Sequence, residues 1–339
     1  MYIIAADVGG TKTRFVFANS DDPGNILFEA RYPSGEFESF GPLLQTFIEE
    51  SGAADHGQVD VLMLALPGLV SESSATLTNL PWTIEKQFIK DNFSINSVFF
   101  MNDFQASAFG ICQLQVKDRV ILNSGASKSA GQNSTTDSAS GLKDNAISVA
   151  VGAGTGLGVA WVQGRQGLAQ AYDTEGGHID FAPVNDTQVR LLQFLQQSYG
   201  HVSYERLLSG DGLVKLYEFC AGKQSPAKQN IGVTAEWVNN QSKNDEAADR
   251  ALSLFVQIYG AYIGNIALLF KPYGGIFITG GIAAKIVNKM QSEDFINAYL
   301  NKGRMRALVE QVAVYLVTNE RIGVLGAISE TLKMLQDSK

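Results

Sequence analysis

Two short glycine-rich turns, each between apolar segments, constrain the fold of this chain more than any other feature. The first is Asp7-Val-Gly-Gly-Thr11, and the second lies within Gly152-Ala-Gly-Thr-Gly-Leu-Gly158. The apolar flanks predict paired strands, and glycine leaves backbone N–H groups open to an approaching anion. Gly9 and Gly154 stand 145 residues apart, about one domain length. The spacing indicates one such turn in each of two domains.

Asp7 ends the first apolar segment, where its carboxylate would hold a hydrated cation against a bound anion. The pattern differs from the P-loop, which requires Gly-Lys-Ser/Thr at the start of a helix after a single strand. An ordinary Gly-Gly hairpin explains the first stretch, taken alone, equally well. The second occurrence of the pattern favours a metal–phosphate site.

The composition limits the classes of partner. The 339 residues are 45% hydrophobic, which is enough for two cores. The formal net charge is −8 and no basic block occurs, so neither nucleic acid nor an anionic membrane is expected as a partner. Cys112 and Cys220 lack the paired spacing of a cysteine zinc site. With no room for a signal peptide, and with residues 252–270 read as a buried helix, a cytoplasmic location is predicted.

Apolar periodicity predicts strands and helices in alternation. Strands are expected at residues 2–6, 14–18, 25–32, 61–66, 98–101, 146–151, 158–162 and 274–281, and helices at 42–50, 187–198, parts of 204–222, from 282 and 323–335. A long helix should end at Phe270, with Ser242 and Asp245 as its candidate caps. Gly260 and Gly264 lie one turn apart on it and predict a closely packed neighbour. The Ser/Gly-rich residues 124–145 have almost nothing to bury, which predicts a mobile surface insert.

Three short polar stretches have the composition of a sugar site. Asn102-Asp103 follows a predicted strand, and Glu175-Gly-Gly-His178 and Tyr204-Glu205-Arg206 follow the second turn. Sugar hydroxyls both donate and accept, so their site needs carboxylates, an amide and an imidazole. Taken alone, Glu175 also fits an ordinary loop carboxylate, Glu205 a charge on a helix surface, and His178 a turn histidine. Their order between two phosphate-binding turns favours the sugar site.

The chain resembles the bacterial glucokinases of the actin-like sugar kinases. The resemblance covers nearly the whole chain and rests on motifs in register: Asp7-Val-Gly-Gly-Thr11, Leu77-Thr-Asn79 with Trp82, Asn102-Asp-Phe104, Gly152 to Gly158, Glu175-Gly-Gly-His-Ile-Asp-Phe-Ala-Pro183, His201-Val-Ser-Tyr-Glu-Arg206 and the strand ending at Gly281. Its implied fold is α/β, with two actin-like (ribonuclease H-like) domains and a cleft between them. Residues 1–112 with 322–339 would form the small domain, and residues 113–321 the large one.

The resemblance also implies ATP-dependent phosphorylation of glucose at its 6-hydroxyl, with Mg²⁺ as cofactor. Asp103 would be the base, and the residues holding the other hydroxyls would be Asn102, Glu175, His178 and Glu205. ATP would lie against Ala6, Asp7, Val8, Gly9, Gly10, Thr11, Gly154, Thr155, Gly156, Gly280 and Gly281. Asp7 would contact the metal, directly or through water.

Lys12 departs from the family, because these glucokinases usually carry Asn there and the ROK sugar kinases carry Lys. The ROK cysteine-rich zinc motif is missing after His178, where Ile179-Asp-Phe-Ala-Pro183 stands instead. Three alternatives stay open: a ROK-like kinase of another hexose or an N-acylated hexosamine, a sugar sensor without catalysis, and an actin-type ATPase. The sequence leaves the oligomeric state open, including a homodimer.

Overall fold

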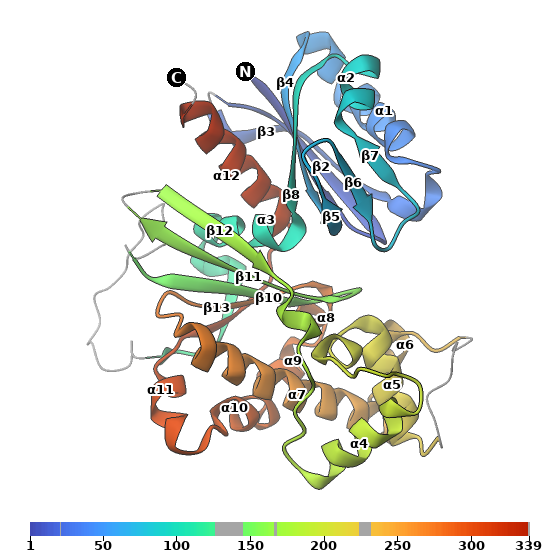
Figure 1. Cartoon of the computed structure of the whole chain (residues 1–339), viewed down its shortest axis with the longest axis vertical. Coiled ribbons are helices and arrows are strands. Elements are labelled where there is room, and N and C mark those ends of the chain that lie inside the picture. Colours follow the sequence, from blue (N-terminus) through green and yellow to red (C-terminus); the bar gives the residue numbers. More distant parts are fainter. Residues whose placement is uncertain (21, 126–144, 166–167, 224–231, 338–339) are drawn as a thin grey trace.

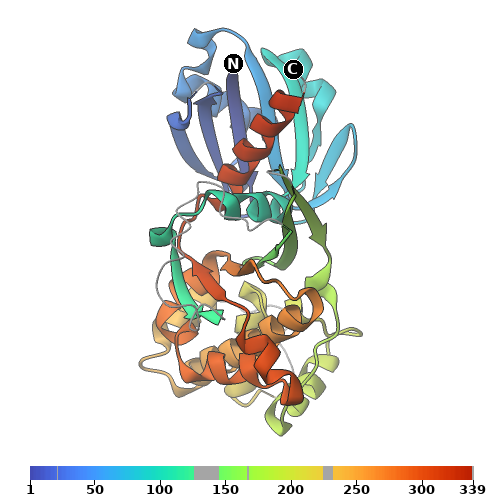
Figure 2. The same ribbon diagram turned by 90° about the vertical axis from the view of Figure 1, so that its left-hand side faces the viewer.

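The computed structural model describes residues 1–20, 22–125, 145–165, 168–223 and 232–337. Its ribbon forms two lobes (Figure 1), and both chain ends lie in the same one, here called the first lobe (Figure 2). The predicted insert falls, except for Ser124, Gly125 and Asn145, outside the described residues. Its predicted mobility is therefore not addressed by the structure.

The first lobe is built on a sheet with the strand order β3-β2-β1-β4-β8. Its strands are β1 (Tyr2–Val8), β2 (Lys12–Asn19), β3 (Asp22–Pro33), β4 (Val59–Leu66) and β8 (Ile95–Asn102). β1 runs antiparallel to β2 and parallel to β4, and β4 runs parallel to β8. Because parallel strands are covered on both faces, β4 is an almost continuous apolar run.

The second lobe repeats this plan in the order β12-β11-β10-β13-β14-β9. Its strands are β9 (Arg119–Asn123), β10 (Ile147–Ala153), β11 (Leu157–Arg165), β12 (Leu168–Thr174), β13 (Gly275–Thr279) and β14 (Val314–Val317). β10 runs antiparallel to β11 and parallel to β13, as β1 does to β2 and β4. The small sheet beside the first contains β5 (Gly68–Val70), β6 (Ser74–Leu77) and β7 (Thr83–Glu85).

Helices cover the outer faces of both sheets (Figure 1). The first lobe carries α1 (Phe40–Ser51) and α2 (Lys86–Asn92). The second carries α4 (Asp186–Gln196), α5 (Gly210–Cys220), α6 (Ala235–Gln241), α7 (Glu246–Phe270), α8 (Gly281–Lys285), α9 (Val287–Met290), α10 (Glu293–Leu300) and α11 (Arg306–Glu310). Every predicted helix is present, with end positions that differ by a few residues.

The helix α3 (Asp103–Gly110) lies between the lobes, and α12 (Ile322–Asp337) crosses it and runs along the first lobe (Figure 2). A Cβ on Gly326 of α12 would overlap the backbone oxygen of Ala106, and one on Gly110 would overlap that of Ile322. The two backbones therefore touch, which only glycine permits. α12 also packs on β1 and β4, as predicted for a final helix that returns to the first lobe.

The long helix α7 forms the centre of the second core. Its N-cap is Asp245, whose carboxylate accepts hydrogen bonds from the next turn; the other candidate, Ser242, instead ends α6. α7 is, among the described residues, long and apolar enough to cross a membrane, but 72% of its 18-residue apolar window is buried in the protein. The close neighbour predicted at Gly260 and Gly264 is α10.

The apolar core is not confined to the separate lobes. Each sheet has a core on its helix-covered outer face. A further cluster joins Ala5 and Met63 of the first sheet to Ala150 and Ala160 of the second, with the apolar residues of α3 and α12 between them. The domain boundaries at residues 112 and 321 stay a prediction.

Candidate active site

A cleft of about 590 Å³ lies where the carboxyl ends of β1, β8, β10 and β13 meet. This is where ligands bind in open α/β sheets. The predicted site residues that line it are Asp7, Gly9, Gly10, Asn102, Asp103, Gly154, Thr155, Gly156, Glu175, His178, Glu205, Gly280 and Gly281. Segments separated by more than 250 residues in the chain are thus brought to one cavity.

The turn after β1 is held open by backbone contacts. The Gly9 N–H donates to the Lys12 carbonyl (3.0 Å), and the Ser34 hydroxyl donates to the Gly9 carbonyl (2.7 Å). A Cβ on Gly10 would lie 2.7 Å from Cβ of Asn79, so the second glycine lets the small sheet approach the turn. The turn is therefore shaped before any ligand binds.

The turn after β10 is linked to one of the predicted sugar carboxylates. The Gly154 N–H donates to the Gly156 carbonyl (2.8 Å) and closes the turn. Glu205 accepts a hydrogen bond from the Leu157 N–H (2.9 Å), and a Cβ on Gly156 would lie 2.5 Å from the same carboxylate oxygen. The turn and the Glu205 carboxylate are therefore positioned together.

Asn102 and Asp103 join the end of β8 to the start of α3. The Asn102 side-chain oxygen caps the helix by accepting from the N–H groups of Phe104 (2.9 Å) and Gln105 (3.1 Å). The oxygen is thus committed to the backbone, and only the amide nitrogen remains to bind a hydroxyl. Asp103 follows in the first helical turn, where the Phe104 N–H also donates to its carboxylate (2.9 Å).

The two carboxyls at the centre of the cleft have raised pKa values. Burial, and then the nearby Asp103, raise the pKa of Asp7 to about 7, against the lowering effect of Arg14 and Arg31. Burial also raises the pKa of Asp103 to about 6; backbone N–H donors oppose the shift, and Glu175 adds to it. Asp103 is therefore a base of intermediate strength that is mostly ionised at neutral pH.

Glu175, His178 and Glu205 form a polar cluster on the second lobe. The His178 Nε2 atom lies 3.7 Å from Glu175 and 3.9 Å from Glu205. The Glu175 side chain is 86% exposed, whereas that of Glu205 is 28% exposed because it is held against the turn. The hydroxyl of Tyr262 on α7 donates to the Gly176 carbonyl (2.8 Å) and fixes the loop from behind. Glu175 is thus free to contact a ligand.

The turn at Gly280 requires glycine. Its φ is +87°, and a Cβ there would overlap the Ala153 carbonyl at the end of β10. Gly281 then begins α8 at the cleft wall. The predicted glycine turn at this helix start is therefore present, beside the turn after β10.

Three residues predicted to hold ATP do not line the cleft. Ala6 and Val8 are fully buried in the core beside β1, because alternate strand residues face away from the turn. Thr11 is exposed, and its carbonyl accepts the Ser34 N–H (3.0 Å). The side chains of these three residues therefore stand outside the cleft, and whether their backbone groups contact ATP stays a prediction.

Other lining residues were not predicted. Thr78 and Asn79 come from the turn after β6, within a motif that was recognised without a role. Asn319 and Glu320 follow β14 and reach the cleft because that strand adjoins β13. The polar residues that directly follow the apolar β14 were the sequence signal that could have predicted their place in the cleft.

Charged residues form a network at the edge of the cleft. Glu29 pairs with Arg14 and with Arg321 (3.0 Å), and Glu320 pairs with Arg31 and with Arg14 (3.4 Å). This network ties β2 and β3 to the segment before α12. It also keeps positive charge near Asp7, which limits the rise in the pKa of that carboxyl.

The comparisons with known proteins agree with this geometry. The glucokinase family model matches residues 4–334. The glucokinase of Nostoc sp. is 33% identical, and the match covers 96% of this chain and 97% of that protein. The chain belongs to the glucokinase family.

Solved structures add the fold. The glucokinase of an Antarctic psychrotroph superposes with a TM-score of 0.76 at 28% identity, and the match covers 97% of this chain and 98% of that one. A ROK family glucokinase from Streptomyces griseus, in complex with glucose and AMPPNP, has a TM-score of 0.65 at 16% identity over 97% and 99% of the two chains, which shows the fold alone. The predicted two-domain actin-like fold and phosphotransferase class are confirmed. Family membership supports ATP-dependent phosphorylation of glucose and gives the ROK-like alternative no better support.

Proposed function

We propose that the chain transfers the γ-phosphoryl group of ATP to the 6-hydroxyl of glucose, with Asp103 as the general base. The observation that carries this proposal is the position of Asp103, a buried carboxyl with its pKa raised to about 6, at the start of α3 in the cleft. The carboxylate accepts the hydroxyl proton as the oxygen bonds to phosphorus. Phosphoryl transfer needs little other covalent chemistry from the protein. The remaining residues therefore position the two substrates and neutralise the charge of the phosphates.

The sugar is assigned to the cluster of Glu175, His178 and Glu205, with the Asn102 amide nitrogen as a further donor. Their carboxylates accept from hydroxyls, and the imidazole donates or accepts according to its tautomer. Glu205 is held by the Leu157 N–H, whereas Glu175 is exposed and would close onto the sugar. A sugar lacking one of these hydroxyls would leave a polar group unpaired.

ATP is assigned to the two glycine turns and the Gly280–Gly281 turn, whose N–H groups favour phosphate oxygens. A bound Mg²⁺ would neutralise the β- and γ-phosphates. Among the described residues, no group of three or more His, Cys, Asp or Glu side chains could hold a metal without help. Asp7 fits a metal that arrives with the nucleotide, since Mg²⁺ usually keeps several waters and takes one or two carboxylates. The charge of such a cation would favour ionised Asp7.

An assay of ADP release tests this function. Glucose, mannose, fructose and N-acetylglucosamine are each supplied with ATP, with and without Mg²⁺. We expect turnover that depends on glucose and on Mg²⁺. Equal turnover with and without sugar would instead identify an ATPase, and faster turnover with N-acetylglucosamine would restore the ROK-like alternative.

A further inference from the structure

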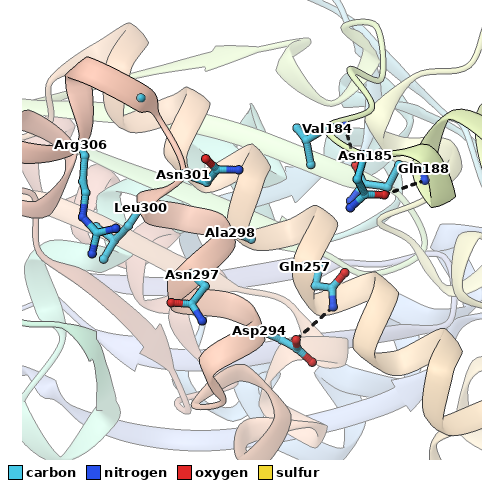
Figure 3. A pocket seen from close by; sticks show the side chains of 11 residues that line it. Val184, Asn185, Gln188, Gln257, Asp294, Asn297, Ala298, Leu300, Asn301 and Arg306 are labelled. Carbon is cyan, nitrogen blue, oxygen red and sulfur yellow. Dashed lines mark hydrogen bonds between the residues drawn. The ribbon is translucent and has the colours of Figure 1, made fainter.

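The second lobe contains another cavity, of about 500 Å³, away from the cleft. It is lined by the start of α4, the middle of α7, the length of α10 and the segment from Asn301 to Arg306, and is called here the amide groove. Figure 3 places Arg306 at one end and Asn185 at the other, with Gln257, Asp294 and Asn297 between them. None of these residues has a role in the proposed phosphoryl transfer.

The centre of the groove offers hydrogen-bonding groups of both kinds. Gln257 donates to one carboxylate oxygen of Asp294 (3.0 Å), and no other described residue is bonded to that carboxylate. The side chains of Asn297 and Asn301 have no hydrogen-bond partner among the described residues, although both line the groove. Amides that donate and accept beside a carboxylate suit a ligand with several hydroxyls.

The wall on the α4 side adds a buried amide. Gln188 is 1% exposed, and its side-chain oxygen accepts the Val184 N–H (3.0 Å). Its side-chain nitrogen donates to no described residue, while the residue lines the groove. This nitrogen is not among the fully buried atoms that lack a partner, so it is open to an acceptor that enters the groove.

One end of the groove favours an anion. The guanidinium of Arg306 has no ion pair with any described residue and lies beside Leu300 and Asn301 (Figure 3). Asp294, the carboxylate of the groove, lies nearer its centre in the same view. An anionic group would therefore sit at the Arg306 end, where the planar guanidinium can bind phosphate in a bidentate manner.

We propose that the amide groove is a second ligand site, which binds a monosaccharide phosphate. Its phosphate would contact Arg306, and its hydroxyls would contact Asp294, Asn297 and Gln188. The reaction product, glucose 6-phosphate, has this chemistry and is the first probe to use.

The groove is connected by contacts to the sugar cluster. Lys302 lies between Asn301 and Gly303 of the groove wall, and its ammonium donates to the side-chain oxygen of Asn265 (2.8 Å). The Asn265 nitrogen donates in turn to the hydroxyl of Tyr204 (3.1 Å), next to Glu205. The opposite wall, at Val184, is continuous in sequence with the Glu175–His178 loop.

A ligand that orders Asn301 and Arg306 would therefore also fix Lys302, and through it the position of Glu205. We expect occupancy of the groove to change the affinity for glucose. This part of the inference rests on the proposed function, whereas binding in the groove does not.

Equilibrium dialysis of radiolabelled glucose 6-phosphate tests the site directly. Saturating glucose and AMPPNP occupy the cleft, so that only binding elsewhere is counted. We expect about one equivalent bound to the wild type and an affinity at least about tenfold lower in Arg306→Met, because a charge-assisted contact is lost. Arg304→Met is the matched control, since Arg304 is exposed and does not line the groove.

Several results would overturn the site. The first is the absence of saturable binding, and the second is an equal loss of affinity in Arg304→Met and Arg306→Met. The third is displacement of the label by inorganic phosphate at the same concentration as by unlabelled glucose 6-phosphate, which would indicate a simple anion site. These outcomes do not depend on kinase activity, so a failed proposed function leaves the test intact.

The connection to the sugar cluster is tested by kinetics. The KM for glucose is measured at increasing glucose 6-phosphate in the wild type and in Arg306→Met. Competition in the cleft is common to both proteins, so the groove accounts for any difference. We expect the change in KM with glucose 6-phosphate concentration to differ severalfold between the wild type and Arg306→Met, with kcat little changed. The same change in both proteins would disprove the connection.

Discussion

The two glycine turns occupy equivalent places in the two sheets, and yet only the strand before the first turn brings a carboxyl group, Asp7, to a position where the other strand has Gly152. Asp7 of β1 pairs with Ala65 on its parallel neighbour, and Gly152 of β10 pairs with Thr279 on its own. The first turn spans residues 9–12 and the second residues 154–156, one residue fewer. The strand plan is therefore repeated, whereas the chemistry at its ends is not.

Phe104 accounts for the difference. A Cβ on Gly152 would lie 2.5 Å from the Thr279 hydroxyl and 3.0 Å from the Phe104 ring, and one on Gly158 would overlap that ring. The space that a carboxylate would need in the second turn is filled by a side chain of α3. The same helix starts with Asp103, so the packing that keeps the second turn neutral also positions the proposed base.

The largest expected effect is at that base. Asp103→Asn keeps the shape of the side chain and removes the proton acceptor, so kcat should fall by about 10²–10⁴-fold. Steady-state kinetics and glucose titration separate this loss from binding, which Glu175, His178 and Glu205 should largely retain. A kcat close to that of the wild type would show that another residue is the base.

The contrast between the turns predicts unequal effects of substitution. Asp7→Asn should lower kcat/KM for MgATP by about 10–100-fold, because a charged contact is typically worth about 1.5–3 kcal/mol. Thr155→Ala in the second turn, which also lines the cleft, should lower it by only about 2–10-fold, because a neutral hydrogen bond is typically worth about 0.5–1.5 kcal/mol. Equal losses in the two variants would mean that the turns act alike.

The pKa of Asp103 sets an expected pH dependence. Because the base must be ionised, kcat/KM should fall about tenfold per pH unit below pH 6. The folded-state pKa is above the ordinary value of 3.8, so ionisation destabilises the fold above pH 6, and this cost is relieved as the pH falls toward 3.8. Asp103→Asn should accordingly unfold at higher denaturant concentration than the wild type at pH 8. A lower midpoint would contradict the assigned burial.

The packing of Phe104 makes a smaller, structural prediction. Gly158→Ala should lower the free energy of unfolding by about 1–3 kcal/mol, as overpacking usually does. Phe104→Leu in the same chain should recover part of the loss, since it removes the ring that the new methyl group meets. Urea denaturation of both variants measures this, and additive losses would exclude the contact.

Local patterns predicted the central strands of both sheets and the glycine turns, but fewer than half of the residues that line the cleft and none of β9, β12 and β14. Asp7, Asp103 and Glu175 could be found because each stands next to a glycine turn or a strand end, which sequence reveals directly. Thr11 does not line the cleft, and its expected contact with ATP stays a prediction.

What sequence did not reveal depends on contacts between distant segments. The capping role of Asn102 was missed because the start of α3 was not predicted, although an Asn followed by an Asp is a common helix start. Asn319 and Glu320 reach the cleft only through the order of the strands, β13 beside β14. No local pattern contains that order.

The crossing of α3 and α12 has a consequence for the order in which the protein is made. The first lobe begins at Tyr2, but the helix that packs on β1 and β4 is translated some 320 residues later. Contacts of such long sequence separation form slowly. During synthesis, the side of the first sheet that faces α12 therefore lacks this helix until the end of the chain has been made. The strands and helices of the second lobe are complete before that point. A chaperone that shields apolar surface during synthesis would act on this side of the sheet, between Ala5 and Met63.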